Sequence, residues 1–304
     1  MSFADKRQSR KGRVGSQTDA ALGFLLTLPI LVTMVSLVFY PLVVTMWDSL
    51  HRVKPTKPGT PFIGLENYGA IFSDGATISA WANSAIYVVI AVIAETFFGI
   101  AAALLLNRIK RGRRWLLAIV ILPWALPGVV NSVMWLWIFN PAAGLLNGAL
   151  TSFGFDFENH LWFTGRVSSI AMVSVVHVWR MMPLTIVIIL AALQGIPQEL
   201  YDASRMDGAR PAHSFLYVTL PLIRSAVAIA MTQSTVQAFN LFEEAWVLNG
   251  TSHDTRPILG QIYLETFQNL NFSYGMALSL VVTLLSLVVS LSFVMRVYRD
   301  TRLD

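Results

Sequence analysis

The sequence predicts an all-α integral membrane protein with six transmembrane helices. Three observations support this fold class: 55% of the 304 residues are hydrophobic, only 13% are charged, and the mean hydropathy is +0.60. A hydrocarbon core about 30 Å thick needs about 20 apolar residues per helical crossing, so six crossings leave only short loops. The basic residues are scattered among apolar segments, so the formal charge of +5 does not indicate a nucleic-acid partner.

Six apolar runs are each long enough to cross a bilayer. The first run follows a polar, basic tail at 1–19 and is too long to be the core of a cleaved signal peptide. The transmembrane domain is therefore expected to cover 20–297, with a second tail at 298–304. The six runs are approximately 20–47, 85–106, 115–139, 168–193, 222–247 and 272–297.

The distribution of basic residues predicts that both termini are cytoplasmic. With this orientation, the basic clusters at 6–13 and 108–114 fall on the cytoplasmic side, where lysine and arginine accumulate in membrane proteins. The outer loops then hold far fewer basic residues.

Pro123 and Pro127 are one turn apart within the third run, and prolines remove backbone hydrogen bonds. This pair predicts a bend that lines a cavity.

No motif for covalent chemistry, nucleotide binding or metal binding is present in the sequence. There is no cysteine, no lysine follows a glycine as a P-loop requires, and no two histidines have the spacing of a zinc site. We therefore expect no catalytic residue, no metal site and no cofactor bound by this chain.

The long polar stretch between the fourth and fifth runs, at 195–221, reads as two short helices. Pro197 and Pro211 each suit the first turn of a helix, and Asp207-Gly208 breaks the chain between them. The first helix, at about 198–205, is too short to be stable alone in water. It is either a connector that lies on lipid headgroups or a docking element for a cytoplasmic partner.

Polar residues recur on one face of the predicted fifth helix. Four of them are spaced 4, 3 and 4 residues apart, which at about 100° per residue places them within an arc of about 60°. They are Gln233, Gln237, Asn240 and Glu244. Because unpaired polar groups are costly in hydrocarbon, this face lines either a water-filled cavity or a hydrogen-bonded helix contact.

Two charged residues are expected near the middle of their spans, Glu95 in the second helix and Arg180 in the fourth. An isolated charge at this depth costs about 2.5–3.5 kcal/mol on insertion scales. We therefore expect Glu95 and Arg180 to form a structural ion pair.

Several motifs in order resemble the permease subunits of type I ABC importers. The segment from Asp202-Ala203-Ser204 through Asp207-Gly208 to Leu220-Pro221 resembles their EAA loop, with Asp202 in place of Glu and Ser204 in place of Ala. The segments 62–68 and 139–147 and the run 239–243 resemble the carbohydrate-uptake family that includes the maltose and glycerol phosphate permeases. The resemblance covers nearly the whole chain.

This resemblance implies a coupling helix that docks in a groove of an ATP-hydrolysing subunit, followed by a tight turn at Gly208 that a side chain would obstruct. The implied coupling residues are Glu199, Asp202, Ala203, Ser204, Arg205, Asp207 and Gly208. The implied partners are a second homologous permease, two ATP-binding subunits that hold ATP and magnesium, an extracytoplasmic solute-binding protein and membrane lipid. The implied location is the bacterial plasma (inner) membrane.

The resemblance also implies a pathway for a sugar or a sugar-like solute, which suits aromatic rings beside amide and carboxylate groups. Besides the four polar residues of the fifth helix, the candidates are Asn131, Trp135, Phe242, Glu243 and Trp246. The tryptophans alternatively belong to the aromatic belt at the membrane surface. Disaccharides, polyols and glycerol phosphates all remain open as solutes.

The function expected from these features is that of a transport subunit without enzymatic activity of its own. The alternative is a secondary, ion-coupled transporter, which typically has internal repeats and mid-membrane coupling carboxylates. No defensible repeat is present, and Glu95 is the one carboxylate expected near mid-span. An intramembrane enzyme is a third class, for which no converging nucleophile, metal ligands or acid–base pair is found.

Overall fold

The computed structural model describes residues 22–250 and 252–300, and this part of the chain is helical, with one isolated antiparallel bridge between His51 and Phe62. The expected tail at 1–19 lies outside the described residues. Within the described ranges, five helices are long and apolar enough to cross a membrane. They are Leu22–Ser49, which includes η1 (Val35–Phe39) and α2 (Tyr40–Ser49), α4 (Gly75–Arg108), α8 (Arg166–Gln194), Pro211–Phe239, and α14 (Phe272–Asp300).

The sixth candidate span is a bent pair of helices. It consists of α5 (Arg113–Ala125) and α6 (Gly128–Ile138), whose axes differ by 96°. The bend lies at the predicted proline pair: Pro123 is in the last turn of α5, and Pro127 is the N-cap of α6. Leu126 has extended backbone (φ −78°, ψ 139°), as expected for the residue before a proline.

The fifth span both begins and ends earlier in the sequence than the apolar run 222–247 suggests. It is a continuous helix from α10 (Pro211–Ser214) through η2 (Phe215–Thr219) to α11 (Leu220–Phe239), and it ends eight residues before the expected end at 247. After a break at 240–242 the chain resumes as α12 (Glu243–Asn249). The other short helices are α3 (Glu66–Ile71), α7 (Leu145–Ser152), α9 (Gln198–Met206), α13 (Ile258–Tyr263) and η3 (Leu264–Gln268).

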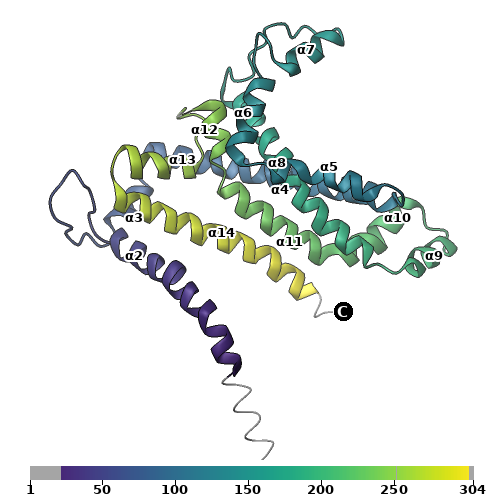
Figure 1. Ribbon diagram of the computed structural model, residues 1–304, viewed down its shortest axis with the longest axis horizontal. Coiled ribbons are helices and arrows are strands. Elements are labelled where there is room, and N and C mark those ends of the chain that lie inside the picture. The colour runs from purple at the N-terminus through teal and green to yellow at the C-terminus, as the bar shows by residue number, and fades with distance from the viewer. Residues whose placement is uncertain (1–21, 251, 301–304) are drawn as a thin grey trace, which may run out of the picture.

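Helices α4, α8, α11 and α14 form the body of the molecule, with α11 in contact with the other three (Figure 1). The helices α9 and α10 lie at one end of this body, and α3 and α13 lie at the opposite end. The α6–α7 segment projects from the body with α12 beside α6.

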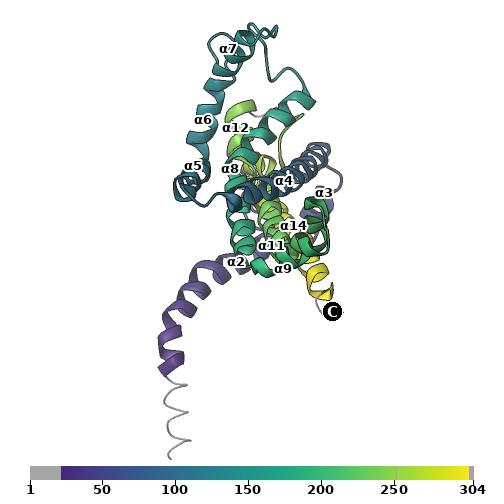
Figure 2. The same ribbon diagram turned by 90° about the vertical axis from the view of Figure 1, so that its right-hand side faces the viewer.

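The Leu22–Ser49 helix leans away from the body in both views (Figure 2). None of the residues in its most apolar 18-residue window is buried. Its contact with the body is made by α2 against α14. Such an apolar surface is stable only against lipid or another apolar protein surface.

A close contact between α4 and α8 depends on Gly99. A Cβ atom on Gly99 would overlap the Cγ2 methyl group of Thr185. Since protein interiors are close-packed, this position accepts a larger residue only if its neighbour becomes smaller.

We expect Gly99→Ala to lower the stability of the purified protein by about 1–3 kcal/mol, because the added methyl group overpacks the interface. Thr185→Ser removes the opposing methyl group and should restore much of the loss. Thermal unfolding in detergent measures both effects. Gly148→Ala is the control, since a Cβ there meets no atom within 4 Å. A loss of the same size at Gly148 would contradict the packing argument.

Candidate functional site

The segment 195–221 forms one short helix and the start of a long one. The expected first helix is α9, Gln198–Met206. The expected second short helix is instead the first turn of the continuous Pro211–Phe239 helix. The sequence did not predict this continuity, because Pro211 and Pro221 both suit the first turn of a helix. The loop is therefore attached directly to the end of a membrane span.

Gly208 ends α9 in a Schellman motif. The Ala209 N–H donates to the Ser204 carbonyl and the Gly208 N–H donates to the Arg205 carbonyl, both at 3.0 Å. Gly208 has φ +78°, while a Cβ on it would meet no atom within 4 Å. The glycine is therefore required by the left-handed backbone and not by crowding, which corrects the expectation that a side chain would obstruct the turn.

The predicted coupling residues are mostly exposed on α9 and its C-terminal turn. Glu199, Ala203 and Asp207 are exposed, and Arg205 Nη1 lies 3.2 Å from Asp202 Oδ1 in an exposed pair. Ser204 is the exception, because it is buried on the side of α9 that faces the rest of the loop. The loop thus presents both charge signs to its surroundings.

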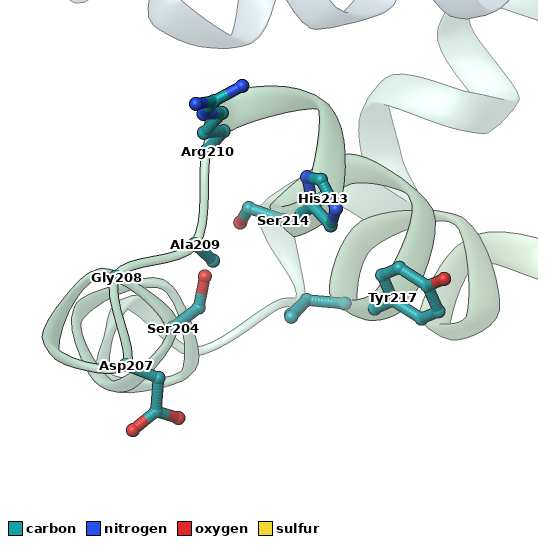
Figure 3. A pocket seen from close by; sticks show the side chains of 9 residues that line it. Ser204, Asp207, Gly208, Ala209, Arg210, His213, Ser214 and Tyr217 are labelled. Carbon is teal, nitrogen blue, oxygen red and sulfur yellow. The ribbon is translucent and has the colours of Figure 1, made fainter.

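A hydrogen bond links α9 to the long helix, and a hollow lies between the two. The Tyr201 hydroxyl lies 3.2 Å from Thr219 Oγ1 of η2. Between α9 and the first turns of the Pro211–Phe239 helix is a hollow of about 480 Å³, lined by residues from Ser204 to Val218 (Figure 3). His213 and Tyr217 stack at a centroid distance of 6.0 Å on its wall.

The expected ion pair between Glu95 and Arg180 is wrong. Arg180 Nη2 lies 2.7 Å from Glu244 Oε1 and 3.6 Å from Glu243 Oε2, so its partners are on α12. The Glu95 carboxylate faces His177 instead, with 3.8 Å between Oε1 and Nε2. Glu95 was predicted to pair with Arg180 because both lie near the middle of their spans. Depth alone does not give the side of the helix on which a residue lies.

These five side chains form one cluster, of which three members are buried. His177 joins its two halves, because its Nδ1 lies 3.3 Å from Glu244 Oε1 while its Nε2 faces Glu95. The side chains of Glu95, His177 and Glu244 are at most 1% exposed, Arg180 is 14% exposed and Glu243 is 43% exposed. The cluster therefore runs from the protein interior to an open surface at Glu243.

The polar stripe of the fifth helix does not continue on a single helix. Gln233 and Gln237 lie on α11, Asn240 lies in the break, and Glu244 is buried on α12. Asn240 is exposed, and its Nδ2 donates to the Val236 carbonyl at 2.9 Å. The arc of about 60° assumed an unbroken helix, so it holds for the first two residues and not for Glu244.

The breaks of the third and fifth spans meet at Arg180. Gly128, the first residue of α6, lies so close to Glu243 that a Cβ would overlap the Glu243 carboxylate, and Arg180 Nη1 would lie 3.2 Å away. Unwound backbone at membrane depth is tolerated only where it is buried in protein or lines a water-filled cavity. With Glu243 and Asn240 exposed, this junction favours a cavity.

The third-span candidates lie on α6. Asn131 is fully buried, and neither of its side-chain polar atoms has a hydrogen-bond partner among the described residues. The Trp135 ring packs against Phe139 at 5.2 Å and Trp179 at 5.5 Å. Trp135 therefore belongs to an aromatic cluster inside the chain.

Sequence reasoning missed His177, which connects the cluster. The available signal was its spacing: His177 and Arg180 are three residues apart on one helix, so they share a face. A histidine and an arginine on one face of an apolar helix call for acidic partners on neighbouring helices.

The chain matches a family of transport proteins. The family described as "Binding-protein-dependent transport system inner membrane component" matches residues 95–299. This range includes both helix breaks, the charged cluster and the loop at 195–221. The chain belongs to this family, so it is a permease subunit of a binding-protein-dependent ABC importer and not an enzyme. Membership decides against the secondary transporter and the intramembrane enzyme.

Among its relatives, the trehalose/maltose transport system permease protein MalF of Thermococcus litoralis is 32% identical over 276 residues, which cover 90% of this chain and 92% of that protein. The trehalose transport system permease protein SugA of Mycobacterium tuberculosis is 30% identical over 272 residues, covering 89% and 87%. The sn-glycerol-3-phosphate permease protein UgpA of Salmonella typhi is also 30% identical, over 272 residues, covering 88% and 91%.

Solved structures confirm the fold class. A chain of a bacterial ABC transporter involved in the import of the acidic polysaccharide alginate superimposes with a TM-score of 0.79 at 19% identity, covering 94% of this chain and 99% of that chain. At this identity the likeness concerns the fold. It agrees with the all-α membrane architecture that the sequence predicts.

We expect Arg180→Met to lower the free energy of unfolding by about 3–5 kcal/mol, because it leaves the buried Glu244 carboxylate without its cationic partner. The yield of folded protein should fall accordingly. The double variant Arg180→Met/Glu244→Gln should recover part of that loss. Detergent-resistant folded protein and thermal unfolding report both. Glu66→Gln is the control: its partner pair with Arg52, at 3.2 Å, is exposed and should contribute at most about 1 kcal/mol. A double variant no better than Arg180→Met would argue against the pairing.

Proposed function

We propose that this chain forms half of the translocation pathway of an ATP-driven sugar importer and transmits the motion of an ATPase to that pathway. The observation that carries the proposal is the continuous Pro211–Phe239 helix. One end of this helix begins at the loop that holds α9, and the other ends at the break beside the charged cluster. At 1.5 Å per residue, 29 residues span about 43 Å.

The coupling part of the proposal rests on the shape and exposure of α9. A helix of nine residues has little stability alone in water, yet its charged side chains point outward while Ser204 faces the loop. Such a helix is suited to docking in a groove on another subunit. We assign that groove to an ATP-binding subunit, one of two that bind ATP and magnesium.

The pathway part rests on the junction of the two breaks. Asn240 and Glu243 have exposed side chains beside the break in the fifth span, and the hydrocarbon core of a membrane would accept neither side chain unpaired. A second homologous permease is proposed to face this junction and to complete the pathway. Gln233, Gln237, Asn240 and Glu243 are proposed to lie along it.

The solute class rests on the relatives, whose names refer to trehalose, maltose and sn-glycerol-3-phosphate. An extracytoplasmic binding protein is proposed to deliver the sugar to the end of the molecule that holds α3 and α13. That end is then external. The α9 end and both termini are cytoplasmic, in the plasma membrane of a bacterium.

The proposed cycle is an exchange between two openings of the pathway. ATP binding on the partner subunits acts through α9, and loaded binding protein acts from outside. Because coupling between two sites is reciprocal in free energy, loaded binding protein should also raise the affinity for ATP.

The proposal is tested by reconstitution. Vesicles that contain this chain, its companion permease and two ATPase subunits should accumulate trehalose or maltose under two conditions. ATP is supplied on the side of the ATPase subunits, and loaded binding protein is supplied on the opposite side. Omitting any one component should abolish accumulation. Accumulation by this chain alone would contradict the proposal.

Asp202→Lys and Gly208→Asp should each abolish uptake in that system, because the first reverses a charge on α9 and the second adds a negative charge next to Asp207 in the turn that ends α9. Gly208→Asn should retain more uptake than Gly208→Ala, since asparagine accepts positive φ more readily. Glu158→Lys, an exposed charge reversal outside the coupling loop, is the control. Normal uptake by Asp202→Lys would rule out a docking role for this face of α9.

A further inference from the structure

Four aromatic rings form a continuous series next to the charged cluster. Phe242 lies 5.2 Å from Tyr263 and 5.3 Å from Trp246, measured between ring centroids. Trp246 and Tyr263 are 4.9 Å apart, and Tyr263 is 5.2 Å from Phe267. The rings come from two segments, the break with α12 and the α13–η3 turn. Tyr263 and Phe267 were not among the residues that the sequence indicated.

The rings are increasingly exposed toward one end of the series. Phe242 and Trp246 are half-buried, Tyr263 is 36% exposed and Phe267 is 61% exposed. The exposed end belongs to the α13 side of the molecule, opposite α9 (Figure 1). The series therefore leads from the proposed external end toward the helix break.

The inner end of the series is next to groups that cannot face lipid. Phe242 immediately precedes Glu243, which is 43% exposed and 3.6 Å from Arg180. A half-exposed ion pair in hydrocarbon is strongly unfavourable. The surface on which Phe242 and Glu243 open therefore faces water or another protein rather than lipid tails.

The charge of this surface selects against anions. Arg180 is already in contact with Glu243 and Glu244. An approaching phosphate or carboxylate would have to displace one of these carboxylates and would be repelled by the other. A neutral solute with hydroxyl groups can instead donate hydrogen bonds to Glu243 and accept them from Arg180.

We propose that the rings of Phe242, Trp246, Tyr263 and Phe267 form a track on which neutral sugar rings stack on their way to the Arg180–Glu243 pair. This inference rests on the proposed function and narrows its solute to an uncharged glycoside. The apolar C–H face of a pyranose lies against an aromatic face while its hydroxyls stay hydrated. Neighbouring platforms about 5 Å apart let the sugar move from one to the next without losing contact.

The test compares rings with aliphatic side chains of similar bulk, in vesicles that contain the complete importer. Tyr263→Leu and Phe267→Leu should each slow trehalose uptake about tenfold, because they keep apolar packing but remove the stacking face. Tyr263→Phe should keep the wild-type rate, since it retains the ring. The ATPase activity stimulated by loaded binding protein should be unchanged in all three, because the coupling loop is intact.

The matched control is Phe153→Leu, an aromatic residue that is 81% exposed and outside the series. It should leave uptake unchanged. Wild-type rates in both leucine variants would overturn the track. A parallel loss of uptake and stimulated ATPase activity would also overturn it, because it would assign the rings to docking of the binding protein or to folding. If the wild-type importer accumulates no neutral sugar, the proposed function itself fails.

A second measurement uses the unaltered protein. Trehalose that carries a diazirine is supplied to the wild-type importer during ATP turnover and then activated by light. Mass spectrometry should find the label on the peptide that contains Tyr263 and Phe267. Label confined to other parts of either permease would overturn the proposal.

Discussion

The contact of Arg180 with Glu243 and Glu244 is the constraint on which the functional part of this molecule depends. It joins α8 to α12 and lies against the first residue of α6, so it fixes two broken spans with one guanidinium group. Breaking a helix in a membrane leaves backbone groups that need partners. The buried carboxylate of Glu244 ties the resumed helix α12 to α8, while the Glu243 carboxylate is partly exposed on one side of the junction.

The spans were predictable because each needs only a long apolar run. The bend in the third span was predictable because two prolines one turn apart remove backbone hydrogen bonds within that run. The break after Phe239 was not predictable, because 240–242 contains neither proline nor glycine. Phe239 and Leu241 are buried in different apolar clusters. The chain leaves the helix in order to reach both, and only the tertiary structure contains that information.

The same break explains the error over the buried charges. Helical periodicity, carried past residue 239, placed Glu244 on a pathway face with Gln233, and Arg180 was left to pair with Glu95. Once the helix ends, the direction of Glu244 is set by α12, and its carboxylate reaches Arg180 and His177.

The short motif at Asp207-Gly208, in contrast, was informative because a Schellman turn depends on one local dihedral angle, which glycine alone adopts without strain.

The Pro211–Phe239 helix contains a wide turn near its start, η2, in which the Leu220 N–H donates to the Phe215 carbonyl five residues earlier. A turn of this kind contains about one residue more than an α-helical turn. It therefore sets the angular phase of the residues that follow, because closing it to a regular α-helical turn without a deletion would rotate Gln233 and Gln237 by about 100° relative to α9. The wide turn thus fixes the side of the long helix on which Gln233 and Gln237 lie relative to the loop that carries α9.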